Sequence, residues 1–124
     1  MLWKHLLLVA LGGGVGSVAR FLGQKWLAGS FNTQFPYGTL FVNILGCLLI
    51  GLIYGLASRH EWMNPEWRIL LMTGFCGGFT TFSAFTLESM GLLQEQKILP
   101  FFIYLFTSVA IGLAATFAGY WITR

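Results

Sequence analysis

The sequence predicts an all-helical integral membrane protein with four transmembrane helices, and three observations lead to this fold class. Charged residues make up only 9% of the 124 residues and hydrophobic residues 56%, whereas a soluble domain carries roughly 25% charged residues. The mean hydropathy is +0.75. Four separate apolar segments each reach the roughly 20 residues that a helix needs to cross a bilayer. Lipid is therefore the expected solvent for most of this chain.

The four expected spans cover residues 6–27, 38–57, 69–93 and 99–122, and they make a single membrane domain over residues 1–124. Short polar connections separate them at 29–36, 59–68 and 94–97. The first segment is too long for the apolar region of a signal peptide and has no clear cleavage site, so we expect it to stay in the membrane. Tryptophan is enriched at lipid–water boundaries, and all five tryptophans lie near segment ends: Trp3, Trp26, Trp62, Trp67 and Trp121.

The distribution of charge excludes nucleic acid as a partner, because the net charge of +3 comes without a basic run or a basic helix face. Four spans place both termini on the same side of the membrane. That side holds Lys4, Arg59, Arg68 and Arg124, and the other side holds Arg20 or its vicinity, Lys25 and Lys97. Four cations against about three is a weak bias under the positive-inside rule. We therefore expect the chain to insert in both orientations.

The titratable and nucleophilic residues form no catalytic pattern, so we do not expect an enzyme. The sequence offers no nucleophile–base–acid constellation and no cluster of His and Glu for a metal. Cys47 and Cys76 lie inside apolar segments without metal-like spacing, and we expect both to be small buried hydrophobic residues. Glu88 is expected to be an interfacial charge near the end of its helix.

The chain has 16 glycines, and small residues recur at four-residue spacing. The pairs are Gly12/Gly16, Gly51/Gly55, Gly74/Gly78 and Ala115/Gly119. Such spacing lets helix backbones approach closely in lipid. These surfaces pack either within one four-helix bundle or between subunits. Because four short helices barely enclose a pore by themselves, an oligomer is favoured.

Residues 12–20 (GGGVGSVAR) form a glycine-rich run that does not match a nucleotide-binding loop. No strand precedes the run, the lysine of a P-loop is missing, and no acidic residue follows about twenty residues on. Arg20 ends the run, roughly 21 Å along the first span at the rise of an α-helix. A cation at that depth either reaches back to the lipid headgroups or lies in the vestibule of a pore and attracts anions.

Asn43 is the unexpected polar residue of a second motif, residues 36–46 (PYGTLFVNILG). A primary amide in an apolar helix needs hydrogen-bond partners. Either it bonds to a neighbouring helix, or it offers its two N–H groups to a permeating anion.

Residues 74–88 (GFCGGFTTFSAFTLE) form the strongest motif, because three glycines and a series of hydroxyl groups lie in the middle of the third span. Glycine costs about 1 kcal/mol relative to alanine in a helix, so the third helix is predicted to break here. A broken span frees carbonyl groups to bind a cation and N–H groups to face an anion.

Phe82 and Phe85 are three residues apart in this motif and share one helix face. They are either ordinary core or lipid-facing aromatics, or they line an anion path. The edge of a phenyl ring is electropositive, so edge-on rings would attract an anion without the full charge that would trap it. Their polar neighbours favour the second interpretation; these are Thr80, Thr81, Ser83 and Thr86.

The three motifs together resemble the Fluc family of fluoride channels, also called CrcB proteins, over nearly the whole chain. The resemblance implies a passive fluoride-selective channel that exports fluoride and gives fluoride resistance. It implies an antiparallel, dual-topology homodimer with two pores in a bacterial inner (plasma) membrane. The implied partners are fluoride, the lipid bilayer and a second copy of the chain.

The resemblance also assigns roles to individual residues. The implied pore residues are Asn43, Thr81, Phe82, Ser83, Phe85, Tyr104 and Ser108. Gly77 and Thr80 match positions whose backbone carbonyls hold a structural sodium ion at the dimer interface. Tyr104 and Ser108 belong to a ladder of hydroxyl groups on the fourth helix. The next rung is Gly112, which has no hydroxyl, and Thr107 or Thr116 is the available substitute.

Two other functions fit parts of the sequence. Small multidrug exporters also have four spans and often dual topology, but they depend on a glutamate in the first span, and this first span contains no acid. A non-conducting accessory subunit is the other alternative, and the absence of ion flux through purified protein would favour it.

Overall fold

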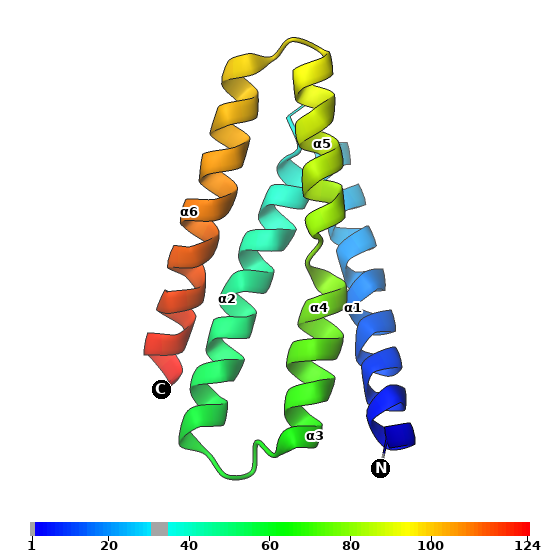
Figure 1. Ribbon diagram of the computed structural model, residues 1–124, viewed down its shortest axis with the longest axis vertical. Coiled ribbons are helices and arrows are strands. Elements are labelled where there is room, and N and C mark those ends of the chain that lie inside the picture. Colours follow the sequence, from blue (N-terminus) through cyan, green and yellow to red (C-terminus); the bar gives the residue numbers. More distant parts are fainter. Residues whose placement is uncertain (1, 31–34) are drawn as a thin grey trace.

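The computed structural model describes residues 2–30 and 35–124, and all regular secondary structure in these residues is helical. Three long helices, α1 (Leu2–Ser30), α2 (Tyr37–Arg59) and α6 (Ile98–Thr123), accompany a third span built from shorter elements. Successive spans alternate in direction, so both ends of the chain lie at one end of the bundle (Figure 1). All four spans are long and apolar enough to cross a membrane. This confirms the prediction of an all-helical membrane protein.

The third span consists of α3 (Pro65–Arg68), the π-helical segment η1 (Ile69–Cys76), α4 (Gly77–Phe79) and α5 (Phe82–Gln94). It begins at Pro65, before the predicted start at residue 69, because Asn64 caps the helix. The Asn64 side-chain oxygen accepts a hydrogen bond of 3.1 Å from the Trp67 N–H, and proline suits the first helical position. The wider turns of a π-helix are frequent near functional sites. Of the predicted connection at 29–36, residues 31–34 lie outside the described part of the chain.

The spans pack mainly as two pairs, α2 against α6 and α1 against η1 and α4. The small-residue pairs lie at these contacts. A Cβ on Gly16 would collide with the Phe75 carbonyl oxygen, and a Cβ on Gly51 would collide with that of Thr116. Other tight glycines on the same contacts are Gly12, Gly55, Gly74, Gly78 and Gly119. These glycines therefore pack helices within one chain, which is the first of the two predicted roles, rather than between subunits.

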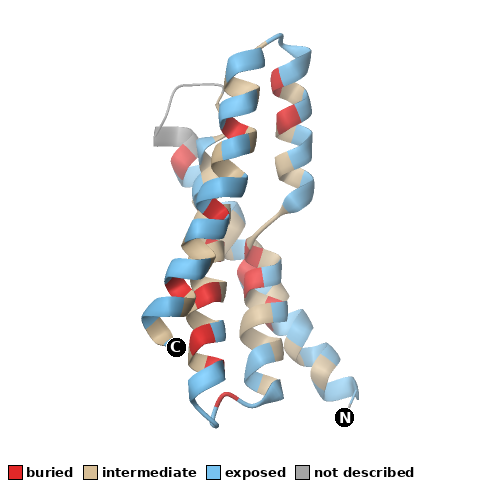
Figure 2. Ribbon diagram, turned by 60° about the vertical axis from the view of Figure 1, so that its left-hand side comes forward, coloured by how far each residue is buried: buried red, intermediate tan, exposed pale blue. Residues whose placement is uncertain are grey.

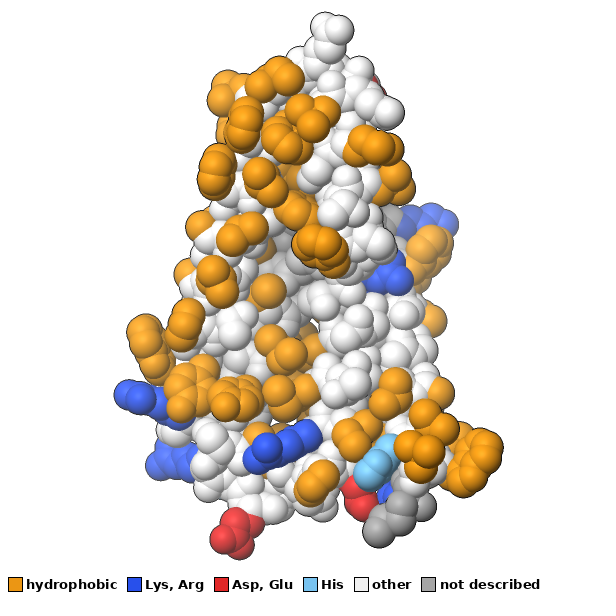
Figure 3. Space-filling model, viewed as in Figure 1, with side chains coloured by type: hydrophobic (Ala, Val, Ile, Leu, Met, Phe, Trp, Pro, Cys, Tyr) orange, Lys and Arg blue, Asp and Glu red, His pale blue; other side chains and the backbone are white. Residues whose placement is uncertain are grey.

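The core of the bundle is narrow, and the exposed surface is apolar. Val42, Cys76 and Tyr104 are the largest fully buried side chains among the described residues. Figure 2 shows that exposed residues predominate along α1 and α6, and large apolar side chains cover much of the face drawn in Figure 3. An apolar surface of this extent marks contact with lipid or with another protein.

Candidate functional site

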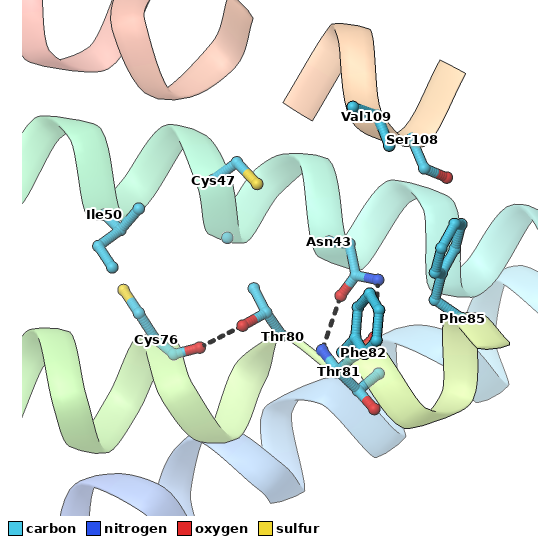
Figure 4. Close-up of a pocket in the computed structure, with 11 residues that line it drawn as sticks. Asn43, Cys47, Ile50, Cys76, Thr80, Thr81, Phe82, Phe85, Ser108 and Val109 are labelled. Atoms are coloured by element: carbon cyan, nitrogen blue, oxygen red, sulfur yellow. Dashed lines mark hydrogen bonds between the residues drawn. The ribbon is translucent and has the colours of Figure 1, made fainter. Parts of the chain in front are cut away.

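A pocket of about 380 Å³ lies beside residues 80 and 81, between α2, the third span and α6. Six of the predicted site residues line it: Asn43, Thr80, Thr81, Phe82, Phe85 and Ser108. Figure 4 shows these residues toward one end of the pocket and Cys47, Ile50 and Cys76 toward the other. Cys47, Ile50 and Cys76 at the apolar end are not among the site residues predicted from the sequence. The spacing of Asn43, Cys47 and Ile50 along one helix face was the available signal.

The backbone leaves the helical conformation between α4 and α5. Thr80 is extended, with φ of −92° and ψ of 156°, and Thr81 is extended with φ of −147° and ψ of 119°. The Thr80 hydroxyl donates a hydrogen bond of 2.8 Å to the Cys76 carbonyl, one turn earlier. The Thr81 hydroxyl caps α5, because its oxygen accepts a hydrogen bond of 3.2 Å from the Ala84 N–H. The two threonines therefore end one helix and begin the next.

Asn43 holds the extended segment from the opposite helix. Its Oδ1 accepts a hydrogen bond of 2.9 Å from the Thr81 N–H, and its Nδ2 donates 3.1 Å to the Thr81 carbonyl. Both partners are backbone groups of one residue, so the carboxamide is fixed in orientation (Figure 4). An asparagine carboxamide carries two N–H bonds, and the hydrogen bond to the Thr81 carbonyl uses only one of those of Asn43.

The interruption leaves backbone groups of opposite polarity without partners. In the described part of the chain, no hydrogen bond reaches the carbonyl oxygens of Gly77, Phe79 and Thr80, and none leaves the N–H groups of Phe82 and Ser83. A helix C-terminus carries partial negative charge and a helix N-terminus partial positive charge. The end of α4 therefore favours a cation, and the start of α5, where Phe82 lies, favours an anion.

Phe82, Phe85 and Tyr104 form a continuous row of rings. The centroids of Phe82 and Phe85 are 5.9 Å apart, and those of Phe85 and Tyr104 are 5.1 Å apart. The Phe82 ring is 78% exposed, whereas Tyr104 is 0% exposed. The Tyr104 hydroxyl is buried and has no hydrogen-bond partner in the described residues. Buried hydroxyl groups without a partner are rare, so this one requires a physical explanation.

Ser108 lines the pocket one turn beyond Tyr104, and Ser83 lies close to Thr81, with 3.3 Å between the two hydroxyl oxygens. Thr116, considered as a substitute for the missing rung at Gly112, has another role. Its hydroxyl lies 3.1 Å from the carbonyl oxygens of both Cys47 and Gly112 and donates to them. The Thr116 hydroxyl proton therefore ties α6 to α2 and is not offered to the pocket.

Arg20 on α1 contacts the third span just before the interruption. Its Nε donates a hydrogen bond of 3.1 Å to the Gly78 carbonyl, and the contact is partly buried. A guanidinium there partly neutralises the carbonyl end of α4. Arg20 is therefore not counted with the cations at either end of the bundle. The end that carries the termini holds Lys4, Arg59, Arg68 and Arg124, and the opposite end holds Lys25 and Lys97.

A polar chain that the sequence analysis missed crosses three helices. The Gln24 side-chain N–H donates 2.9 Å to the Thr39 hydroxyl, and that hydroxyl donates to the Glu88 carboxylate. Thr39 is only 4% exposed. Glu88 therefore has a hydrogen-bond partner on α2, a contact that was not predicted from the sequence. Polar residues at 24 and 39 inside apolar segments were the available signal.

Comparisons with known proteins show the family of this chain. The model of the CrcB-like protein family, described as Camphor Resistance (CrcB), matches residues 7–120. A relative from Leptospira interrogans named "Fluoride-specific ion channel FluC" is 42% identical over 121 residues, which covers 98% of this chain and 95% of the relative. Relatives with the same name from Flavobacterium psychrophilum and Phocaeicola vulgatus are each 47% identical. The matches cover 94% of both chains in the first case, and 98% of this chain and 99% of the relative in the second. The resemblance drawn from the three motifs is thereby confirmed, and the chain belongs to the CrcB family.

Proposed function

We propose that this chain forms a passive, fluoride-selective channel that exports fluoride across a bacterial membrane and gives fluoride resistance. The interruption of the third span is the observation that carries the proposal. It brings the positive end of α5, the Asn43 carboxamide and the rings of Phe82 and Phe85 to one pocket. The three relatives above, named as fluoride-specific channels, support the choice of ion.

Fluoride is small and strongly hydrated, so a selective pore must replace its water with several weak donors. Rings of full charge would hold the ion too tightly, because conduction requires binding that is weak enough to release. Asn43, the hydroxyl groups of Thr81 and Ser83 and the electropositive edges of Phe82 and Phe85 are donors of the required kind. The path then continues along Phe85 to Tyr104 and Ser108 on α6.

No energy source is needed for such export. Fluoride enters cells as neutral HF from acidic surroundings and dissociates inside. A negative membrane potential favours the exit of one elementary charge by about 2.3 kcal/mol per 100 mV. A passive channel therefore lowers the internal fluoride concentration.

The proposal includes a structural sodium ion bound by backbone carbonyls of Gly77 and Thr80. The fit is supported by chemistry, since both carbonyl oxygens lack hydrogen bonds within the described residues and belong to the negative end of α4. Carbonyl oxygens are ligands that suit hard cations. When bound, sodium would supply a fixed positive charge next to the interruption. Gly77 is exposed on the surface of the single chain, so a second chain can supply the remaining ligands.

The proposal also includes an antiparallel homodimer whose subunits insert in opposite orientations. Phe82 lies next to the pocket and is 78% exposed in the single chain, which a second copy would cover. A cysteine introduced near Gln96 is expected to react with impermeant reagents from both sides of the membrane. Labelling from one side alone would contradict dual topology.

Growth in fluoride tests the proposed function in cells. A bacterial strain without its own fluoride exporter is expected to grow in millimolar fluoride when it expresses this chain, and to stop growing when it expresses the Phe82→Ile variant at the same level. Equal sensitivity of cells with and without the wild-type chain would contradict the proposal.

A further inference from the structure

The two hydrogen bonds of Asn43 replace two bonds that an unbroken helix would make. In a continuous α-helix the Thr81 N–H would donate to the carbonyl four residues earlier, that of Gly77. The Thr81 carbonyl would likewise accept from the N–H of Phe85. Here both Thr81 groups bond instead to the Asn43 carboxamide, at 2.9 Å and 3.1 Å. Asn43 therefore occupies the hydrogen-bonding places that Gly77 and Phe85 hold in a regular helix.

We propose that Asn43 is a positioning residue for the cation site, acting through the backbone without touching the ion. Its Oδ1 takes the Thr81 N–H, and the Gly77 carbonyl is left without that donor and free to bind sodium. A buried N–H group without an acceptor costs about 1–3 kcal/mol. Without Asn43, Thr81 would avoid that cost by donating to Gly77 and closing the helix. This inference rests on the proposed sodium site.

The carboxamide serves the two sides of the interruption with different atoms. Oδ1 is used entirely for the Thr81 N–H, which concerns the cation side. Nδ2 gives one N–H to the Thr81 carbonyl and keeps one for an anion in the pocket. One side chain thus couples the sodium site to the fluoride path, and suitable substitutions separate the two contributions.

Two variants at this position separate them. Asn43→Asp keeps an acceptor for the Thr81 N–H in either protonation state of the carboxyl group, but it loses both N–H bonds, the one that donates to the Thr81 carbonyl and the one left over for the pocket. Asn43→Leu has a similar volume and loses both groups. Sodium binding is then measured on purified protein in detergent, as the rise in unfolding temperature with NaCl relative to choline chloride. This measurement does not depend on fluoride transport.

Asn43→Leu is expected to raise the sodium concentration that gives half of the full rise by about tenfold or more, which corresponds to about 1.4 kcal/mol. Asn43→Asp is expected to stay within about threefold of the wild type in this assay, a difference of less than 1 kcal/mol. Fluoride efflux from liposomes is expected to fall in both variants. Ser58→Ala is the matched control, because Ser58 lies on the same helix, is exposed and donates only to its own helix at Gly55.

Wild-type sodium affinity in Asn43→Leu would overturn the inference. If Asn43→Leu does not fold, Asn43→Asp decides alone, and loss of sodium affinity in parallel with fluoride efflux in that variant would overturn it as well. A wild-type protein without any sodium-dependent rise would remove the sodium site and this inference together. Fluoride efflux by the same wild-type sample would still test the channel separately.

Discussion

Replacing Phe82 or Phe85 with isoleucine is expected to reduce fluoride efflux from liposomes by at least about tenfold. Isoleucine keeps a large apolar side chain at the site but lacks the electropositive ring edge that faces an anion. A tenfold decrease corresponds to a loss of about 1.4 kcal/mol in the stabilisation of the ion in transit. The centroids of the two rings are 5.9 Å apart. Because the rings are neighbours, the effects of the two substitutions are not expected to add.

A matched control distinguishes loss of the pore from loss of the fold. Phe117 lies on α6, is 55% exposed, and its one ring contact within the described residues is a tilted pair with Trp121. Phe117→Ile is expected to leave efflux within about twofold of the wild type, which is less than 0.5 kcal/mol. All three variants are expected to elute from a size-exclusion column at the same volume as the wild type, which shows that the fold is kept. Unchanged efflux in both Phe82→Ile and Phe85→Ile would exclude the rings from the path.

Tyr104→Phe is expected to separate conduction from stability. The Tyr104 hydroxyl is buried without a partner, and an unsatisfied hydroxyl costs about 1–3 kcal/mol of stability. Removing it should leave the unfolding temperature unchanged or higher. Efflux should fall by about tenfold, about 1.4 kcal/mol, because in our account the passing fluoride ion is the partner of that hydroxyl.

The two readouts of Tyr104→Phe decide between three roles of the residue. Lower efflux with undiminished stability supports the proposed contact with fluoride. A parallel fall of efflux and unfolding temperature would assign the hydroxyl a structural role. Full efflux would remove Tyr104 from the path, and the hydroxyl ladder on α6 would then begin at Ser108.

Composition and residue spacing were sufficient to predict the fold class. Apolar segments of bilayer length can hardly fold otherwise, because a helix satisfies its own backbone in lipid. The glycine-rich run at residues 74–78 followed by Thr80 and Thr81 likewise predicts a place where a helix loses stability. Several predicted site residues line one pocket, since this motif and the Asn43 turn of α2 lie at the same depth in the bundle.

Other features of the site depend on which helices are neighbours, and local sequence does not encode that directly. Asn43 was expected to serve an anion or a neighbouring helix, but its two bonds to the Thr81 backbone follow only from the packing of α2 beside the third span. Gln24, Thr39 and Glu88 lie on three different helices and form one chain. The carbonyl oxygens proposed for sodium have no side-chain signature at all, since every residue has a carbonyl group.

Fluoride efflux through purified wild-type protein is the most direct test of whether this chain forms a fluoride-selective channel. Liposomes containing the protein are loaded with potassium fluoride, valinomycin is added to carry the balancing potassium, and an electrode records fluoride outside. We expect fast fluoride release, and no matching chloride release from liposomes loaded with potassium chloride. An absence of fluoride release from well-folded protein, or equal release of chloride, would contradict it.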